Sequence, residues 1–156
     1  MEPLPSTARR LDPDAIAPFL SPYLTAGRRA ETWAIREVEI DGDRLRAVVG
    51  MTSTFVSPTD AGGFHLTAFS TLEFVSQLVI IHAHVWAGLD RKTREGWLLE
   101  TSIRTANAIR DPDHIEVGLV SKSIRKIGES ILGNFEFTVA DRHGGSFTGR
   151  LKAFLA

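Results

Sequence analysis

One apolar segment of the chain carries polar side chains of the kind that perform chemistry. Glu73, Ser76 and Gln77 lie close together in the stretch FHLTAFSTLEFVSQL, and His65 precedes them. A carboxylate is expensive to bury in an apolar helix, whereas active sites are places where such groups are retained. The pattern therefore indicates general acid–base chemistry carried by Glu73 and His65.

A glycine pair leads into this segment. Gly62 and Gly63 stand just before the expected start of a helix. The first amides of a helix have no partner within it and carry a partial positive charge. Because glycine also lets a ligand approach the backbone closely, this place is a candidate oxyanion site. The alternative interpretation is a plain flexible loop.

The expected helix has one polar stripe and one broad apolar face. No Gly or Pro occurs between about Thr67 and Ala87, and Gly88 is a natural stop. At about 100° per residue, Glu73 and Gln77 share one side. This stripe faces either a ligand pocket or solvent. It consists of Glu73, Gln77, Ile80 and His84, flanked by Ser70 and Ser76, and the apolar face consists of Phe74, Val75, Leu78, Ile81 and Val85.

The remaining sequence predicts a short helix followed by strands. Asp12 and Pro13 are typical of a helix start, and Asp41-Gly42 and DRHGGS predict turns. Residues 1–10 are expected to be flexible, and residues 11–156 to form a single domain. The strands are expected in ETWAIREVEI, RLRAVVGMTSTF, GWLLETSIRTANAI, HIEVGLVSKSIRKIGES, ILGNFEFTVAD and SFTGRLKAFLA.

Composition excludes several classes of function. The chain has 156 residues, 43% hydrophobic and 24% charged, with a formal net charge of −1, so there is no basic field for nucleic acid. It has no cysteine, which excludes disulfides, thiolate catalysis and Cys-rich zinc sites. The apolar run LVIIHAHVWAGL is too short to span a bilayer, and MEPLPSTARR has no apolar signal region. We therefore expect a cytoplasmic protein that is not bound to a membrane.

Two further groups of side chains have a functional and a structural interpretation. His82 and His84 are two residues apart on the helix and point in different directions, so we expect no metal there; His82 is expected to be a hydrogen-bonded core residue. No cofactor is indicated. Lys122, Arg125 and Lys126 in SKSIRK form either a charged sheet face or a patch for the phosphates of CoA or phosphopantetheine.

The order of elements predicts an α+β fold in which a curved antiparallel sheet wraps a long central helix. This organisation is similar to that of the hotdog fold. The rival is a cone-shaped α+β barrel of the SnoaL/NTF2 kind, which usually places more helix ahead of its sheet.

From about Leu11 to its end, the chain resembles in pieces the FcoT-like fatty acyl-CoA thioesterase family of hotdog proteins. The resemblance implies a pocket of hydrogen-bonding side chains. Tyr23 matches a family tyrosine, Thr59 stands where the family has a second tyrosine, and Thr67 and Ser76 stand where it has two asparagines. The resemblance rests on Pro22-Tyr23, His65 with Ala68, Gln77-Leu78, and Asp141 with Gly144, Gly145 and Gly149.

Glu73 departs from that family, whose pattern is apolar here. A Glu followed four residues later by Gln resembles instead the FabZ-like 3-hydroxyacyl-ACP dehydratases, which use a loop histidine and a helix glutamate. His65 and Glu73 match these roles. However, His65 lies only eight residues before Glu73 and lacks the following proline of the dehydratase loop.

These resemblances imply an acyl-CoA or acyl-carrier-protein thioesterase of fatty-acid, polyketide or lipopeptide metabolism, working as a homodimer or dimer-based oligomer. Glu73 then activates or holds water, amides after Gly63 polarise the carbonyl, and hydrogen bonds come from Tyr23, His65, Thr67, Ser76 and Gln77. The first alternative is dehydration with His65 as base and Glu73 as acid. The second is a non-catalytic acyl or carrier-protein binding domain.

Overall fold

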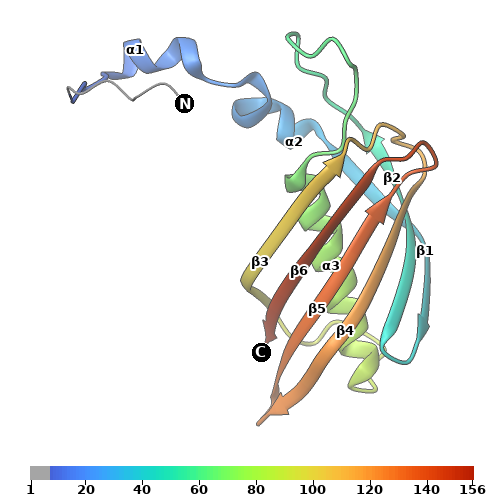
Figure 1. Cartoon of the computed structure of the whole chain (residues 1–156). Helices are drawn as coiled ribbons and strands as arrows, with labels where there is room; N and C mark the ends of the chain where they lie inside the picture. The colour runs from blue at the N-terminus through green and yellow to red at the C-terminus, as the bar shows by residue number, and fades with distance from the viewer. Residues whose placement is uncertain (1–7) are drawn as a thin grey trace.

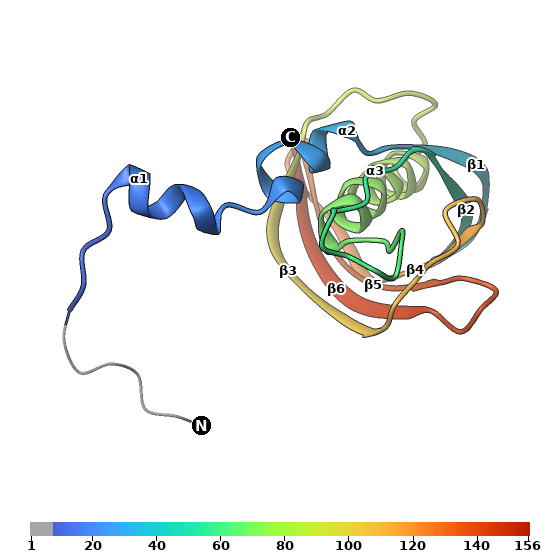
Figure 2. The ribbon, with the colours of Figure 1, turned by 90° about the horizontal axis from the view of Figure 1, so that it is seen from above.

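A single antiparallel sheet wraps one long helix in the computed structural model, which describes residues 8–156 (Figures 1 and 2). The strand order is β1-β2-β4-β5-β6-β3, and Figure 2 shows the strands as an arc around the helix α3. The predicted α+β arrangement is therefore confirmed. The main elements are β1 (Thr32–Asp41), β2 (Arg44–Ser53), α3 (Ala68–Trp86), β3 (Gly96–Asn107), β4 (Ile115–Ile127), β5 (Ser130–Ala140) and β6 (Ser146–Leu155).

The central helix begins and ends where its sequence predicts. Thr67 is the N-cap, and its hydroxyl accepts a hydrogen bond from the Ser70 N–H at 3.3 Å. Gly88, at φ +76°, follows the last turn in a backbone conformation that glycine adopts freely. The predicted apolar face is confirmed at Phe74, Val75 and Leu78, which are fully buried, but Val85 is half exposed.

The helix is long and apolar enough to cross a membrane by length and composition. A buried core helix meets the same criterion, and half of its apolar window lies inside this fold. The inner faces of the strands supply the rest of the core. Their buried residues alternate along β2 (Leu45, Ala47, Val49, Met51), β4 (Ile115, Val117, Leu119) and β5 (Phe135, Phe137, Val139).

Strand β3 differs from the other strands because almost all of its side chains are accessible to solvent. It lies at one edge of the sheet and pairs only with β6. All of its residues except Ile103 are exposed, and Trp97 and Leu99 keep 62% and 51% of their surface accessible. A long edge strand with exposed apolar side chains is a ready template for pairing with another chain.

The segment before the sheet is built from single turns: α1 (Pro13–Ile16), η1 (Ala17–Phe19), η2 (Tyr23–Gly27) and α2 (Arg28–Ala30). Asp12 caps α1 as predicted. Figure 1 shows α1 projecting away from the sheet, whereas α2 lies against the body of the protein. Gly27 packs on Phe55 so closely that a Cβ there would lie 2.3 Å from the ring, and this contact holds the end of η2 against the loop that follows β2.

Asp141 ties two loops together at the end of the sheet that faces the start of α3. Its Oδ2 accepts from the N–H groups of Arg110 and Asp111 at 2.9 and 3.3 Å, and its Oδ1 from those of His143 and Gly145 at 2.9 and 2.8 Å. Burial opposes ionisation of this carboxyl, yet the four backbone donors lower its pKa to about 2.

His82 is a core residue, as predicted, but the prediction that it is hydrogen-bonded is wrong. It is 1% exposed and stacks edge-on against Phe135, and neither ring nitrogen has a partner within residues 8–156. The β1–β2 turn approaches this ring, but no hydrogen bond of good geometry forms. Burial lowers the pKa of this imidazole, although the backbone of Gly42 and the charge of Asp43 in that turn oppose the shift.

We expect His82→Leu to be more stable than the wild type by about 1 kcal/mol at neutral pH, because two unpaired buried nitrogens are removed. The unfolded histidine takes up a proton as pH falls below about 6.5, whereas the folded one does so only at lower pH, so wild-type stability decreases over that interval. In His82→Leu, the part of the pH dependence of the free energy of unfolding that comes from this histidine should be absent. Urea unfolding between pH 7.5 and 5 measures it, with exposed His143→Leu as control; an unchanged slope in His82→Leu would contradict the assignment.

Candidate active site

A cavity of about 460 Å³ lies at the N-terminus of α3. Tyr23 from η2, Thr105 from β3 and Phe147 from β6 join the segment that begins α3, so four separate parts of the chain meet there. The amides of Ala68 and Phe69 belong to the first turn of α3, and no hydrogen bond recorded within residues 8–156 uses them. The lining consists of Tyr23, His65, Leu66, Thr67, Ala68, Phe69, Thr105, Ala108 and Phe147.

Beside the cavity, four side chains form a hydrogen-bonded network centred on a buried carboxylate. Glu31 is 6% exposed, and its Oε2 accepts from the Tyr23 hydroxyl at 3.1 Å and from the Ser70 hydroxyl at 2.6 Å. The Tyr23 oxygen also lies 2.6 Å from the Thr67 hydroxyl. Glu31 Oε1 is buried and has no partner among the described residues. This network links η2, the residue that joins α2 to β1, and the start of α3.

Tyr23 is held as a neutral phenol in this network. Burial raises the pKa of its hydroxyl above the ordinary value of 10.0, the Thr67 hydrogen bond opposes the shift, and the charge of Glu31 adds to it. Its ring lies near those of Phe55 and Phe69, with centroids 6.2 and 6.3 Å away. The tyrosine is therefore fixed by packing as well as by hydrogen bonds.

Glu73 lies on the accessible side of α3, with 46% of its side chain exposed. Its Oε2 accepts from Trp33 Nε1 at 2.9 Å, and its Oε1 lies 3.5 Å from Arg28 Nη1. Phe69, which lines the cavity, is one helical turn before it on the same face. The guanidinium of Arg28 lies 6.0 Å from the Phe69 ring centroid, so α2 and β1 together orient this carboxylate.

The predicted polar stripe is not uniform in its surroundings. Gln77 is half-buried, and Ser76 with Ile80 lines a small cavity of about 100 Å³ against β3. His84 is buried: its Nδ1 lies 2.7 Å from the Ile80 carbonyl, and its Nε2 accepts from the Thr93 N–H. Only Glu73 in this stripe is a charged group open to solvent.

His65 lies at the mouth of the cavity and pairs with an acidic side chain. Its Nδ1 is 2.7 Å from Asp60 Oδ2. The hydrogen bond from the Gly62 N–H, together with the charge of His65, lowers the pKa of Asp60 against some desolvation. Arg110 Nη1 donates to the Gly62 carbonyl at 2.7 Å, so this loop is held at several points. A loop tied in this way can present His65 in a defined orientation.

Two other predicted residues of that loop lie apart from the cavity lining. Gly63 has φ +75°, a conformation that favours glycine, and directly precedes the segment that forms the lining. Thr59 is exposed, and its hydroxyl lies 3.1 Å from that of Ser57. The roles assigned to them stay predictions.

The basic residues predicted to bind phosphate do not form one cluster. Arg125 and Lys126 are neighbours in β4, so their side chains point to opposite faces of the sheet. Lys122 lies 3.9 Å from Glu136 on the outer face. The assignment of these three residues to CoA phosphates stays a prediction.

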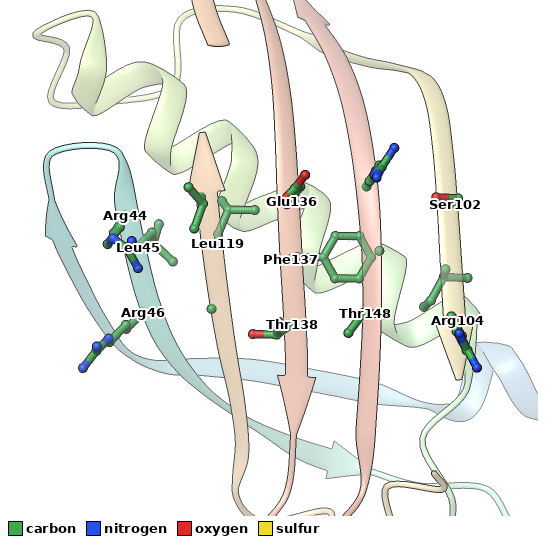
Figure 3. A pocket seen from close by; sticks show the side chains of 15 residues that line it. Arg44, Leu45, Arg46, Ser102, Arg104, Leu119, Glu136, Phe137, Thr138 and Thr148 are labelled. Carbon is green, nitrogen blue, oxygen red and sulfur yellow. The ribbon is translucent and has the colours of Figure 1, made fainter. Parts of the chain in front are cut away.

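Arginines gather instead around a hollow of about 680 Å³ on the outer face of the sheet, on the opposite side from α3 (Figure 3). Register places Arg46, Gly118, Thr138, Thr148 and Arg104 in one row across five strands. The four guanidinium groups at the hollow form no ion pair within residues 8–156. They belong to Arg44, Arg46, Arg104 and Arg150.

Neither a family profile nor a curated protein matches this chain. Several solved structures are similar to it. A mutant thioesterase from Pseudomonas aeruginosa is 17% identical, with 78% of this chain and 81% of that chain covered and a TM-score of 0.53. A thioesterase from Haemophilus influenzae is 7% identical over 95% and 92% of the two chains, with a TM-score of 0.55. The chain has the hotdog fold.

Some hotdog neighbours were solved with a ligand. A hypothetical thioesterase from Streptococcus pneumoniae, crystallised with coenzyme A, is 11% identical, with 80% and 89% coverage and a TM-score of 0.52. A Streptococcus mutans protein bound to acetyl-CoA is 12% identical, with 81% and 90% coverage and a TM-score of 0.51. At these identities the likeness establishes the hotdog fold, while FcoT-like membership stays a prediction.

Sequence reasoning missed Glu31. It stands in GRRAETW, a stretch whose charges are typical of a solvated surface. Its burial accompanies its hydrogen bonds to Tyr23 of η2 and Ser70 of α3. No local pattern in the sequence indicates these two partners.

Proposed function

We propose that this protein hydrolyses acyl-CoA thioesters at the cavity where α3 begins. The observation that carries the proposal is the accessible carboxylate of Glu73, fixed by Trp33 and Arg28 one helical turn from the cavity lining. Support also comes from hotdog neighbours that are thioesterases or were solved with coenzyme A or acetyl-CoA. Carrier-protein thioesters, with the same reacting group, are the other predicted substrates.

In this mechanism, water attacks the thioester carbonyl carbon while Glu73 accepts its proton. The carbonyl oxygen becomes an oxyanion, for which the free N–H groups of Ala68 and Phe69 are donors. The C–S bond then breaks, and the proton held by Glu73 passes to the departing thiolate. The products are a carboxylic acid and a free thiol, and the carboxylate is regenerated.

Mass spectrometry of the purified protein with saturated and 3-hydroxyacyl-CoAs of several chain lengths tests the proposal. Free acid together with free CoA is the expected result. An enoyl-CoA, lighter than its substrate by one water, would replace hydrolysis by dehydration. Absence of turnover on every CoA and carrier-protein ester would overturn the proposed activity in favour of a binding domain.

Dehydration of 3-hydroxyacyl thioesters is the second candidate because His65 at the cavity mouth is paired with Asp60. A histidine oriented by a carboxylate is a suitable base for the proton next to the thioester carbonyl. Glu73, once protonated, would donate to the leaving hydroxyl, so that water and an enoyl thioester form. His65→Ala should then abolish enoyl formation, whereas hydrolysis through Glu73 would continue.

We also propose that two copies of the chain pair through β3. All described residues of this strand except Ile103 are exposed, its outer edge is free, and Trp97 and Leu99 keep more than half of their surface accessible. Trp97→Lys/Leu99→Lys is expected to shift the light-scattering mass from a dimer to the monomer of 17.2 kDa. Val38→Lys on β1, the opposite edge strand, is the matched control. A wild type that is monomeric at assay concentration would contradict this assembly.

A further inference from the structure

Glu31 is the one buried carboxylate whose hydrogen bonding is incomplete among the described residues. Asp141, also buried, uses both oxygens on four backbone donors, whereas Glu31 Oε1 has no partner. A buried carboxylate with an unpaired oxygen destabilises a fold, and such groups are concentrated at functional sites. Its partner Tyr23 lines the cavity.

The positions of the protons in this network follow from what each group can do. An ionised carboxylate only accepts, so the hydroxyls of Tyr23 and Ser70 both donate to Glu31 Oε2. The Tyr23 hydroxyl therefore donates its only proton to Glu31. Its oxygen accepts a hydrogen bond from the Thr67 hydroxyl, 2.6 Å away. Thr67 in turn accepts from the Ser70 N–H. Each donor is used once.

This order leaves the Tyr23 oxygen with one free lone pair and no free proton. We propose that Glu31 is a positioning residue that fixes Tyr23 as a hydrogen-bond acceptor toward the cavity, where its oxygen orients the water that attacks the thioester. This inference rests on the proposed function. Without the carboxylate, the phenol is free to turn its proton to Thr67 or into the cavity, where it would repel the hydrogens of that water.

The test compares Glu31→Leu, which removes the acceptor of the Tyr23 hydroxyl, with Tyr23→Phe and the double variant on an acyl-CoA that the wild type hydrolyses. Each single variant is expected to lower kcat by about tenfold with little change in KM, as for loss of one hydrogen bond in the transition state. If Glu31 acts through Tyr23, the double variant is no slower than Tyr23→Phe. Additive losses, or a wild-type kcat in Glu31→Leu, would overturn the proposal. Exposed Glu39→Gln on β1 is the control.

A second readout needs no turnover, because Tyr23 is the only tyrosine in the chain. The near-ultraviolet absorbance of tyrosinate therefore titrates this group alone. Since the charge of Glu31 contributes to the raised pKa of Tyr23, Glu31→Gln should form tyrosinate at lower pH. An unchanged titration would overturn the proposal even in an active protein. If the wild type hydrolyses nothing, the proposed function fails, and the titration still decides whether Glu31 holds Tyr23.

Stability separates this role from a structural one. Removing a buried charge with an unpaired oxygen is expected to leave the free energy of unfolding of the apolar variant Glu31→Leu equal to or above that of the wild type. A variant that is less stable but keeps its kcat, or that does not fold, would identify Glu31 as a structural residue and overturn the proposal.

Discussion

Glu73→Gln is expected to lower kcat for acyl-CoA hydrolysis by about 10²–10⁴-fold, the usual contribution of a positioned general base. The amide keeps an oxygen for Trp33 Nε1, so the side chain retains its place, but it no longer accepts a proton from water. KM should change little. Initial rates of free-thiol release from the substrate identified by mass spectrometry measure both quantities.

The matched control is Glu37→Gln, an exposed carboxylate on β1 that lies outside the candidate site. It should keep wild-type rates. The half-exposed pair of Glu73 with Arg28 contributes at most about 1 kcal/mol, so a large loss of stability is not expected from Glu73→Gln. Full activity in both Glu73→Ala and Glu73→Gln would show that this carboxylate is not the base.

Asp141→Asn is expected to have the largest effect on stability, about 2–3 kcal/mol at pH 7. The amide cannot accept from all four backbone donors that the carboxylate now satisfies. For a chain of this length, the loss corresponds to a melting temperature lower by roughly 5–10 °C. Thermal and urea unfolding of the two proteins measure it, with exposed Asp90→Asn as control.

The difference between wild type and Asp141→Asn should depend on pH with a defined sign. The folded pKa of about 2 lies below the ordinary value of 3.8, so the carboxylate stabilises the fold above about pH 4. This contribution is lost as pH falls from about 4 to 2. The two unfolding curves should therefore converge on acidification; a constant difference would mean that the carboxylate is not ionised in the fold.

Local sequence signals predicted the elements well because their causes are local. Thr67 and Gly88 bound the central helix, and Asp41-Gly42 marks the first hairpin, with Gly42 at φ +60°. The strand order was not predictable in the same way. After α3 the chain passes to the far edge of the sheet, so β3 pairs with β6 rather than with β2, and paired residues such as Thr101 and Leu151 are about fifty positions apart in sequence.

The candidate site was predicted in part, for a similar reason. Tyr23, His65 and Thr67 do meet at one cavity. The partners that define their chemistry come from distant positions: Trp33 is 40 residues from Glu73, and Glu31 is 39 from Ser70. No helical or strand periodicity relates such pairs. They are set by the packing of η2, α2 and β1 against α3, which only the tertiary structure reveals.

The exposure of β3 also means that the stability of the fold would depend on protein concentration if a second copy binds this strand. A strand whose side chains are almost all exposed in one chain is further stabilised by whatever binds it. If a second copy does so, the free energy of unfolding includes the association constant, and the melting temperature rises with protein concentration. Dilution would then weaken the wall of the cavity to which Thr105 of β3 contributes, and activity per molecule would fall with it.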